Sequence, residues 1–129
     1  MAQVNILPEP GLESELPLIP YNFLALPQEQ SSIDTSRVAL IPIPYDSTTS
    51  FRGGSRDGPD AMIKASYGLE DYDFELEMDV SKIGIHTTGA IESHMAGPFH
   101  MTQRIKSVVT SYVRLGKTVG LLGGAHSIT

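Results

Sequence analysis

The sequence predicts an α/β fold in which helices cover both faces of a parallel sheet. The first observation is the order of the apolar patterns, which from residue 38 onward alternate between the periods of strands and of helices. The second is the continuous apolar run at 38–41, which is typical of a strand buried on both faces of a parallel sheet. Parallel strands need crossover connections, and the intervening helices supply them in the right-handed sense.

Length and composition bound the class of protein. The chain has 129 residues, which suits one domain, and 40% of them are hydrophobic, which is enough for a folded core. A formal charge of −6 makes nucleic acid a poor partner. The absence of cysteine excludes disulfides, thiolate metal sites and cysteine nucleophiles. No apolar run approaches the roughly 18 residues that span a bilayer, and the N-terminus has no leader pattern, so we expect no membrane partner and a cytoplasmic location.

Residues 1–36 are predicted to form an irregular arm before the domain at 37–129. Prolines interrupt any helix or central strand in this stretch. They are Pro8, Pro10, Pro17, Pro20 and Pro27. Apolar residues recur between them, which a free linker would not need. We therefore expect the arm to pack on a surface, either of this chain or of a neighbouring subunit.

The first strand, at 38–42, leads through a loop rich in turn residues into a helix at 59–67. Pro59 suits the first helical position, where its missing N–H needs no partner, and Gly68 suits the helix end. The segment 70–79 then alternates acidic and apolar residues. This alternation predicts a half-exposed strand or another extended segment.

The second half of the domain is predicted to hold strands at 82–86 and 118–122 around a helix at 98–115. Apolar residues step along this helix by four, three, four and three positions and form one stripe. They are Met101, Ile105, Val108, Tyr112 and Leu115. We expect the last four of them to be buried, and Gly116 to end the helix.

A candidate site follows the strand at 118–122, where Gly123 and Gly124 permit a tight turn before His126. Ligands of open α/β sheets bind beyond the carboxyl ends of strands. Imidazole is a ligand for Mn, Fe, Ni, Zn and Cu, so His126 is a candidate metal ligand that we expect to face a cavity. The alternative is a histidine that only forms hydrogen bonds. Ser127 suits either a nucleophile or a helix cap.

Other features have structural interpretations that we prefer. Arg52 and Arg56 could cradle an anion, but with five donors each they are expected to hold the loop at 45–58 instead. The acidic run at 70–79 could collect Ca²⁺, yet its alternation places the carboxylates along a solvated face. The remaining histidines, at His86, His94 and His100, show no spacing that places two of them on one helix face.

Two motifs resemble the agmatinase and arginase ureohydrolases. The stretch Gly54-Ser-Arg-Asp-Gly-Pro59 is similar to the Gly-x-Arg-x-Gly-Pro element that opens the family domain. The stretch Gly123-Gly-Ala-His-Ser127 is similar to the Gly-Gly-Asp-His-Ser motif of the family. The motifs stand in the family order and a strand, a helix and a strand separate them, so the resemblance covers residues 37–129.

The resemblance implies a single three-layer α/β domain with a binuclear Mn²⁺ centre, whose bridging hydroxide attacks a guanidinium carbon. The histidine of the second motif is a manganese ligand in the family, which makes His126 the metal ligand carried over to this chain. No catalytic residue is carried over. The implied reaction is the hydrolysis of a guanidino compound, foremost agmatine to putrescine and urea. The implied partners are this small substrate and further copies in a homo-oligomer.

The chain departs from the family in two ways. Ala125 stands where the family has an aspartate, and alanine cannot accept a hydrogen bond. The aspartate-rich motifs that supply the other metal ligands of the family do not occur in this sequence. We therefore expect an incomplete form of the enzyme that self-associates through exposed sheet edges. One alternative is a non-catalytic family member that acts through oligomerisation. The other is an unrelated nucleotide-binding domain, but the sequence contains no phosphate-loop pattern that would support it.

Overall fold

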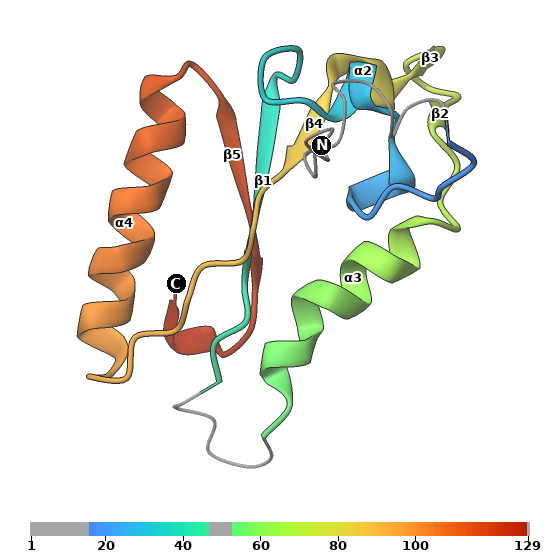
Figure 1. Ribbon diagram of the computed structural model, residues 1–129. Coiled ribbons are helices and arrows are strands. Elements are labelled where there is room, and N and C mark those ends of the chain that lie inside the picture. Colours follow the sequence, from blue (N-terminus) through green and yellow to red (C-terminus); the bar gives the residue numbers. More distant parts are fainter. Residues whose placement is uncertain (1–15, 47–52, 129) are drawn as a thin grey trace, which may run out of the picture.

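A parallel sheet of three strands forms the centre of the computed structural model, which describes residues 16–46 and 53–128 (Figure 1). The strands are β1 (Val38–Ile43), β4 (Ile85–Thr87) and β5 (Thr118–Gly123), in the order β4-β1-β5. Both neighbours run parallel to β1. The strands predicted at 38–42 and 118–122 are therefore confirmed, as is the parallel sheet.

Helices cover the two faces of this sheet. Figure 1 shows α4 (Pro98–Arg114) on one side and α3 (Gly58–Ser66) on the other. From β1 the chain passes to β4 at one edge of the sheet, and it then passes back beyond β1 to β5 at the opposite edge. Because crossovers keep one hand, reversing their direction moves the second helix to the opposite face. The predicted three-layer arrangement and both helices are thus confirmed. In the described part no helix is long and apolar enough to cross a membrane.

The main core lies on the α4 side of the sheet. Alternate residues of β1 and its extension are fully buried there, as the period of a strand requires. The cluster consists of Ile41, Ile43, Tyr45, Ile91, Met101, Ile105, Ala125 and Ile128. The cluster joins β1, α4 and the turn after β5, so it fixes the carboxyl edge of the sheet as one unit.

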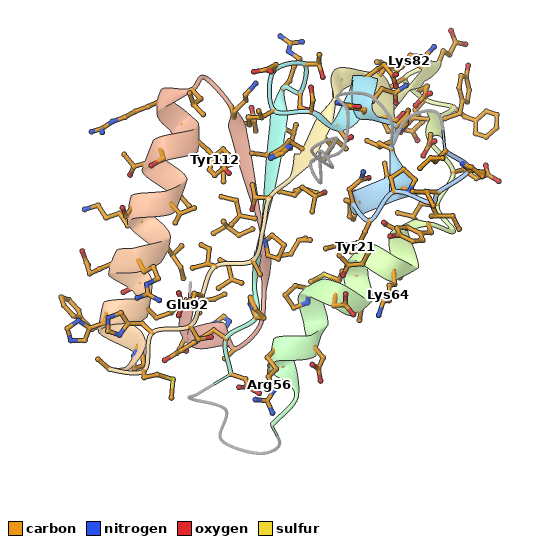
Figure 2. All side chains as sticks on the ribbon, in the orientation of Figure 1. Tyr21, Arg56, Lys64, Lys82, Glu92 and Tyr112 are labelled. Carbon is orange, nitrogen blue, oxygen red and sulfur yellow. The ribbon has the colours of Figure 1, made fainter. Side chains whose placement is uncertain are left out.

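The helix α4 follows its predicted stripe only in part. Met101 and Ile105 are buried, and Val108 is half-buried against the core. Tyr112, labelled in Figure 2, is half-buried against the core as well. The prediction was wrong for Leu115, which is 62% exposed. Leu115 is the C-cap, beyond the last helical residue, where the chain turns away.

A Schellman motif produces this turn. The N–H of Lys117 donates to the carbonyl of Tyr112 at 3.2 Å, and that of Gly116 to Val113 at 2.9 Å. Gly116 adopts φ +77°, which glycine reaches without a Cβ clash. The helix therefore ends at the glycine that the sequence indicated.

The strand predicted at 82–86 begins later, at Ile85. Val80–Ile83 form a 3₁₀ turn instead. The Asp79 carboxylate accepts hydrogen bonds from the hydroxyl and the N–H of Ser81, at 2.6 and 2.9 Å, which also hold the pKa of that carboxyl below its usual value. Gly84 follows at φ +79°, with Ser36 so close that a Cβ would lie 2.7 Å from its Cα. This local turn chemistry outweighs the apolar pattern.

The segment 70–79 folds back on itself rather than forming one extended strand. Its two short strands, β2 (Tyr72–Asp73) and β3 (Met78–Asp79), pair antiparallel. The Asp73 carboxylate accepts the N–H groups of Glu75 and Leu76, each at 2.9 Å, and this Asx turn reverses the chain. The predicted solvated acidic face is confirmed only in part: the glutamates of the hairpin are exposed, its aspartates are half-buried, and its apolar residues are exposed too.

The arm is more regular than predicted where the structure describes it. It contains a 3₁₀ turn, η1 (Phe23–Ala25), and a single helical turn, α2 (Gln28–Ser31). The N–H of Phe23 donates to the Thr87 hydroxyl at 2.9 Å, and that of Leu24 to the Ser66 hydroxyl at 2.8 Å. The arm therefore packs on α3 and β4 of its own chain. Its first 15 residues lie outside the described part.

Candidate functional site at the carboxyl edge of the sheet

Three segments meet where β1 and β5 end. They are the turn after β1, the short turn η2 (Ser55–Asp57) before α3, and the segment after β5 that contains η4 (His126–Ile128). All three lie at the carboxyl edge of a parallel sheet, where α/β proteins bind their ligands. Both sequence motifs are brought together at this edge.

Close packing of backbone holds the turn after β5 in place. The N–H of Ala125 donates to the carbonyl of Tyr45 at 2.6 Å. A Cβ on Gly124 would lie 2.4 Å from the Tyr45 oxygen and 3.1 Å from the Ser55 oxygen. Only glycine fits between these two carbonyls, which explains the second glycine of the motif.

His126 lies where the sequence placed it, directly beyond the carboxyl end of β5. It opens η4 and its side chain is exposed. Among residues 16–46 and 53–128, no three histidines, aspartates or glutamates come close enough together to hold a metal ion. The role of His126 as a metal ligand, and the cavity it was expected to face, therefore remain predictions.

Tyr45 and Ala125 are joined by the backbone hydrogen bond just described, and both belong to the main buried cluster. Tyr45 is fully buried and Ala125 is 6% exposed. The Tyr45 hydroxyl has no hydrogen-bond partner among the described residues. A buried hydroxyl without an acceptor is costly, and the methyl group of Ala125 cannot serve as one. Sequence reasoning singled out Ala125 but missed this tyrosine.

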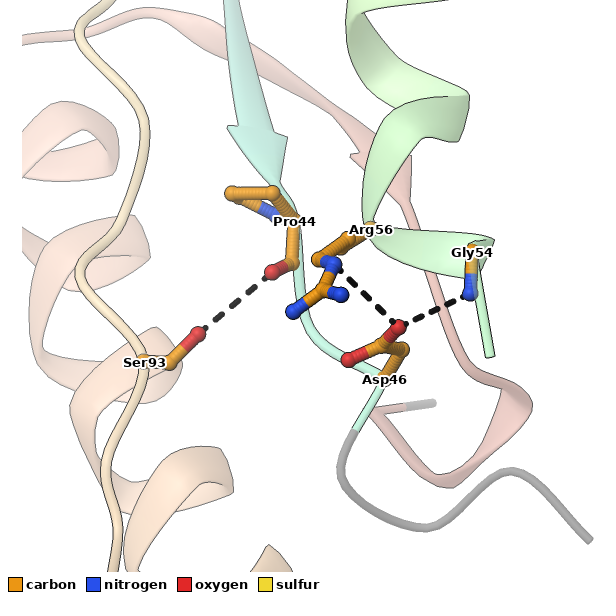
Figure 3. A network of polar contacts seen from close by, with 5 residues as sticks. All are labelled: Pro44, Asp46, Gly54, Arg56 and Ser93. Carbon is orange, nitrogen blue, oxygen red and sulfur yellow. Dashed lines mark hydrogen bonds and ion pairs between the residues drawn. The ribbon is translucent and has the colours of Figure 1, made fainter. Parts of the chain in front are cut away.

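Asp46 organises the loop before α3 (Figure 3). Its carboxylate accepts the N–H of Gly54 at 3.0 Å and lies 3.7 Å from the Nε of Arg56. The expected contact between Arg56 and a carboxylate is thus confirmed, although this largely exposed ion pair contributes little stability. Arg52 lies outside the described residues. Asp46 itself was missed, and its signal was its position two residues after Pro44, where β1 has ended.

The remaining candidates do not join this site. The Nδ1 of His86 lies 2.8 Å from the carbonyl of Ser31, so His86 ties β4 to the arm. The rings of His94 and His100 stack with centroids 5.0 Å apart, next to the start of α4. The acidic run at 70–79 belongs to the hairpin, far from the carboxyl edge in Figure 1. These residues have structural partners and bring no further ligand to His126.

Comparison with known proteins identifies the family. Residues 36–129 match the arginase family. An N(1)-aminopropylagmatine ureohydrolase of Thermus thermophilus is 35% identical over 107 residues, which cover 82% of this chain and 36% of that protein. Agmatinase of Bacillus subtilis is 32% identical over 90 residues, which cover 70% of this chain and 31% of that protein.

A solved structure supports the same conclusion. The crystal structure of agmatine ureohydrolase of Thermoplasma volcanium superposes with a TM-score of 0.73 at 27% identity, over 91% of this chain and 38% of that chain. The chain thus spans about a third of the length of these relatives. The motifs at both strand ends, the three-layer sheet and these matches agree, and the chain belongs to the arginase family of ureohydrolases.

Proposed function

We propose that this chain is part of a metal-dependent hydrolase that releases urea from a guanidino compound. The observation that carries the proposal is the geometry at the carboxyl edge, where the backbone of Tyr45 and Ser55 encloses Gly124 and so sets the position of His126. A turn constrained in this way fixes where the backbone of His126 lies before any ligand arrives, which suits a metal ligand. Membership of the arginase family supports the same assignment.

The proposed substrate is agmatine, cleaved to putrescine and urea. Relatives named agmatinase and agmatine ureohydrolase support it. Relatives named N(1)-aminopropylagmatine ureohydrolase support a longer guanidino amine equally well. Both compounds carry the same guanidinium group on an amine chain, so the proposed substrate class is a guanidino amine. A cytoplasmic location and a homo-oligomeric assembly are proposed with it.

The proposed cofactor is Mn²⁺, with His126 as one of its ligands. The described residues do not by themselves fit a binuclear centre. Such a centre needs several donor atoms, mostly oxygens, and the imidazole of His126 supplies only one. The buried environment at Ala125 offers no carboxylate either. The other ligands must therefore come from outside the described residues, and no step of the reaction is assigned to residues of this chain.

The same observations favour a second candidate, a non-catalytic family member that acts through assembly. Ala125 lacks the carboxylate that the family motif has, and the described part holds no metal-binding cluster. Such a protein would keep the fold and the oligomer surfaces and would release no urea.

Calorimetry and a urea assay distinguish the two candidates. We expect the 129-residue chain to show neither stoichiometric Mn²⁺ binding nor urea release from agmatine. The chain carrying Ala125→Asp, joined to the remainder of the Bacillus subtilis agmatinase, is expected to show both. The matched control is the same fusion with His126→Ala, which should lose tight Mn²⁺ binding while keeping its helical circular dichroism.

Each contrary result has a definite meaning. Stoichiometric Mn²⁺ binding by the chain alone would show that its ligands lie elsewhere. Tight Mn²⁺ binding by the fusion with His126→Ala would show that His126 is not a metal ligand. A folded fusion that binds Mn²⁺ and releases no urea would favour the non-catalytic candidate.

A further inference from the structure

A group of cations lies at the amino edge of the sheet, at the opposite end from His126. Arg37 directly precedes β1, Lys117 directly precedes β5, and Arg114 is the last residue of α4. Figure 1 shows the starts of both strands and the end of α4 at the same end of the molecule. These three residues are called the amino-edge cluster below.

Strand register brings Arg37 and Lys117 next to each other. The strands β1 and β5 pair from their first residues, and the N–H of Thr118 donates to the carbonyl of Arg37 at 3.0 Å. Side chains alternate along a strand, so Arg37 falls on the same face as Ile41. By the same period Lys117 falls on the face of Val119. Ile41 and Val119 both pack in the main core, so the two cations lie on the face of the sheet that α4 covers.

No carboxylate neutralises the amino-edge cluster. Among residues 16–46 and 53–128, ion pairs occur only in α3 and in the loop before it. Arg37 and Arg114 are exposed, and so is Asp34, which forms no ion pair with either of them in this part of the chain. The ammonium of Lys117 donates to the carbonyl of Ser36 at 2.6 Å, which uses only part of its donor capacity.

A structural role explains only part of this cluster. Cations near the C-terminus of a helix are stabilised by its negative end, which accounts for Arg114 and Lys117 after α4. It does not account for Arg37, which belongs to another strand and adds a second positive charge beside Lys117. Like charges on neighbouring strands lower stability. In a chain with a formal charge of −6, such an uncompensated pair indicates a site for an anion.

We propose that the amino-edge cluster binds a phosphate-type oxyanion, either free or carried on a small metabolite. The guanidinium of Arg37 offers a planar fork of donors that matches two phosphate oxygens, and the ammonium of Lys117 adds a compact charge beside it. A bound oxyanion also removes the repulsion between these two cations. Because the site lies at the edge of the sheet opposite His126, it requires neither the metal nor the guanidino substrate proposed above.

Isothermal titration calorimetry of the full 129-residue chain tests this site. Pyrophosphate serves as the free anion and ADP as a metabolite that carries the same group, and the tighter ligand identifies the source of the phosphate. We expect saturable binding that weakens as salt is added. Arg37→Gln and Lys117→Gln should each weaken it at least about tenfold, since each removes charge-assisted hydrogen bonds. The matched control Lys106→Gln removes the same charge from an exposed position on α4 and should bind like the unmodified chain.

Thermal unfolding gives an independent readout. Without added anion and at low salt, Arg37→Gln should raise the unfolding midpoint by about 1–4 °C, because it removes the repulsion from Lys117. Lys106→Gln should leave the midpoint unchanged. Pyrophosphate should raise the midpoint of the unmodified chain and raise that of Arg37→Gln much less. The proposal is overturned if neither phosphate compound binds, if binding survives both Arg37→Gln and Lys117→Gln, or if Lys106→Gln weakens binding equally.

Discussion

Replacing Gly124 with alanine is expected to lower the free energy of unfolding by about 3 kcal/mol or more, as overpacking that displaces backbone does. The added Cβ would lie 2.4 Å from the carbonyl oxygen and 3.0 Å from the nitrogen of Tyr45. The oxygen accepts the N–H of Ala125 at 2.6 Å and the nitrogen donates to the carbonyl of Ile43 at 2.9 Å, so moving either atom disturbs a hydrogen bond. Urea unfolding followed by circular dichroism measures this loss.

Alanine substitutions at two other glycines serve as controls for the loss of stability expected at Gly124. Gly89 has no atom within 4 Å of an added Cβ, so Gly89→Ala should change the free energy of unfolding by less than about 0.5 kcal/mol. At Gly123 the added Cβ meets the end of the Ile128 side chain at 3.0 Å, which can shift. We expect Gly123→Ala to fall between the other two. Equal stability of the Gly124 and Gly89 variants would contradict the close approach of the two strand ends.

Introducing aspartate at Ala125 is expected to destabilise the isolated chain by about 2–4 kcal/mol at neutral pH, because it buries a charged carboxylate without a cationic partner. Ala125 is 6% exposed and is surrounded by the main apolar cluster. Burial raises the pKa of such a carboxyl above its unfolded value. The loss should therefore be smallest at low pH, where the group is protonated in both states, and should grow as pH rises from the unfolded pKa to the folded pKa.

We expect the hydroxyl of Tyr45 to reduce this loss. In the unmodified chain that hydroxyl has no partner among the described residues, so Tyr45→Phe should leave stability unchanged or raise it by about 1 kcal/mol. An aspartate at position 125 would offer it an acceptor from the same cluster. Ala125→Asp should then cost more stability in the Tyr45→Phe background than with tyrosine present. A double-mutant cycle measures this coupling, and additive effects would show that the two side chains do not meet.

The sequence alone was sufficient for the order and type of the main elements. The apolar run at 38–41, the stripe through Met101 and Ile105, and Gly116 are local signals, and the structure places β1, α4 and the helix end as they predicted. The position of His126 beyond a strand end was also predictable, because a parallel α/β order brings strand ends to one edge. The family motifs added the expected chemistry to that position.

Two other elements differ from their predicted form because of turns that a periodic pattern does not display. The alternation at 70–79 does not reveal the Asx turn at Asp73, and the stripe on α4 does not reveal that Leu115 lies past the helix end. Periodicity shows which side of an element is apolar, but it does not show whether another element covers that side.

The carboxyl edge of the sheet shows the same division most clearly. The sequence displays Ala125 as a departure from a motif, and it carries no sign that this alanine donates its N–H to Tyr45 or that the tyrosine hydroxyl lacks an acceptor. Nor does it show that Asp46 joins Gly54 and Arg56 into one loop. Local propensity and period are properties of neighbouring residues, whereas hydrogen-bond satisfaction and burial are set only when distant segments pack together. For that reason the sequence located the candidate site, and the tertiary structure determined its composition.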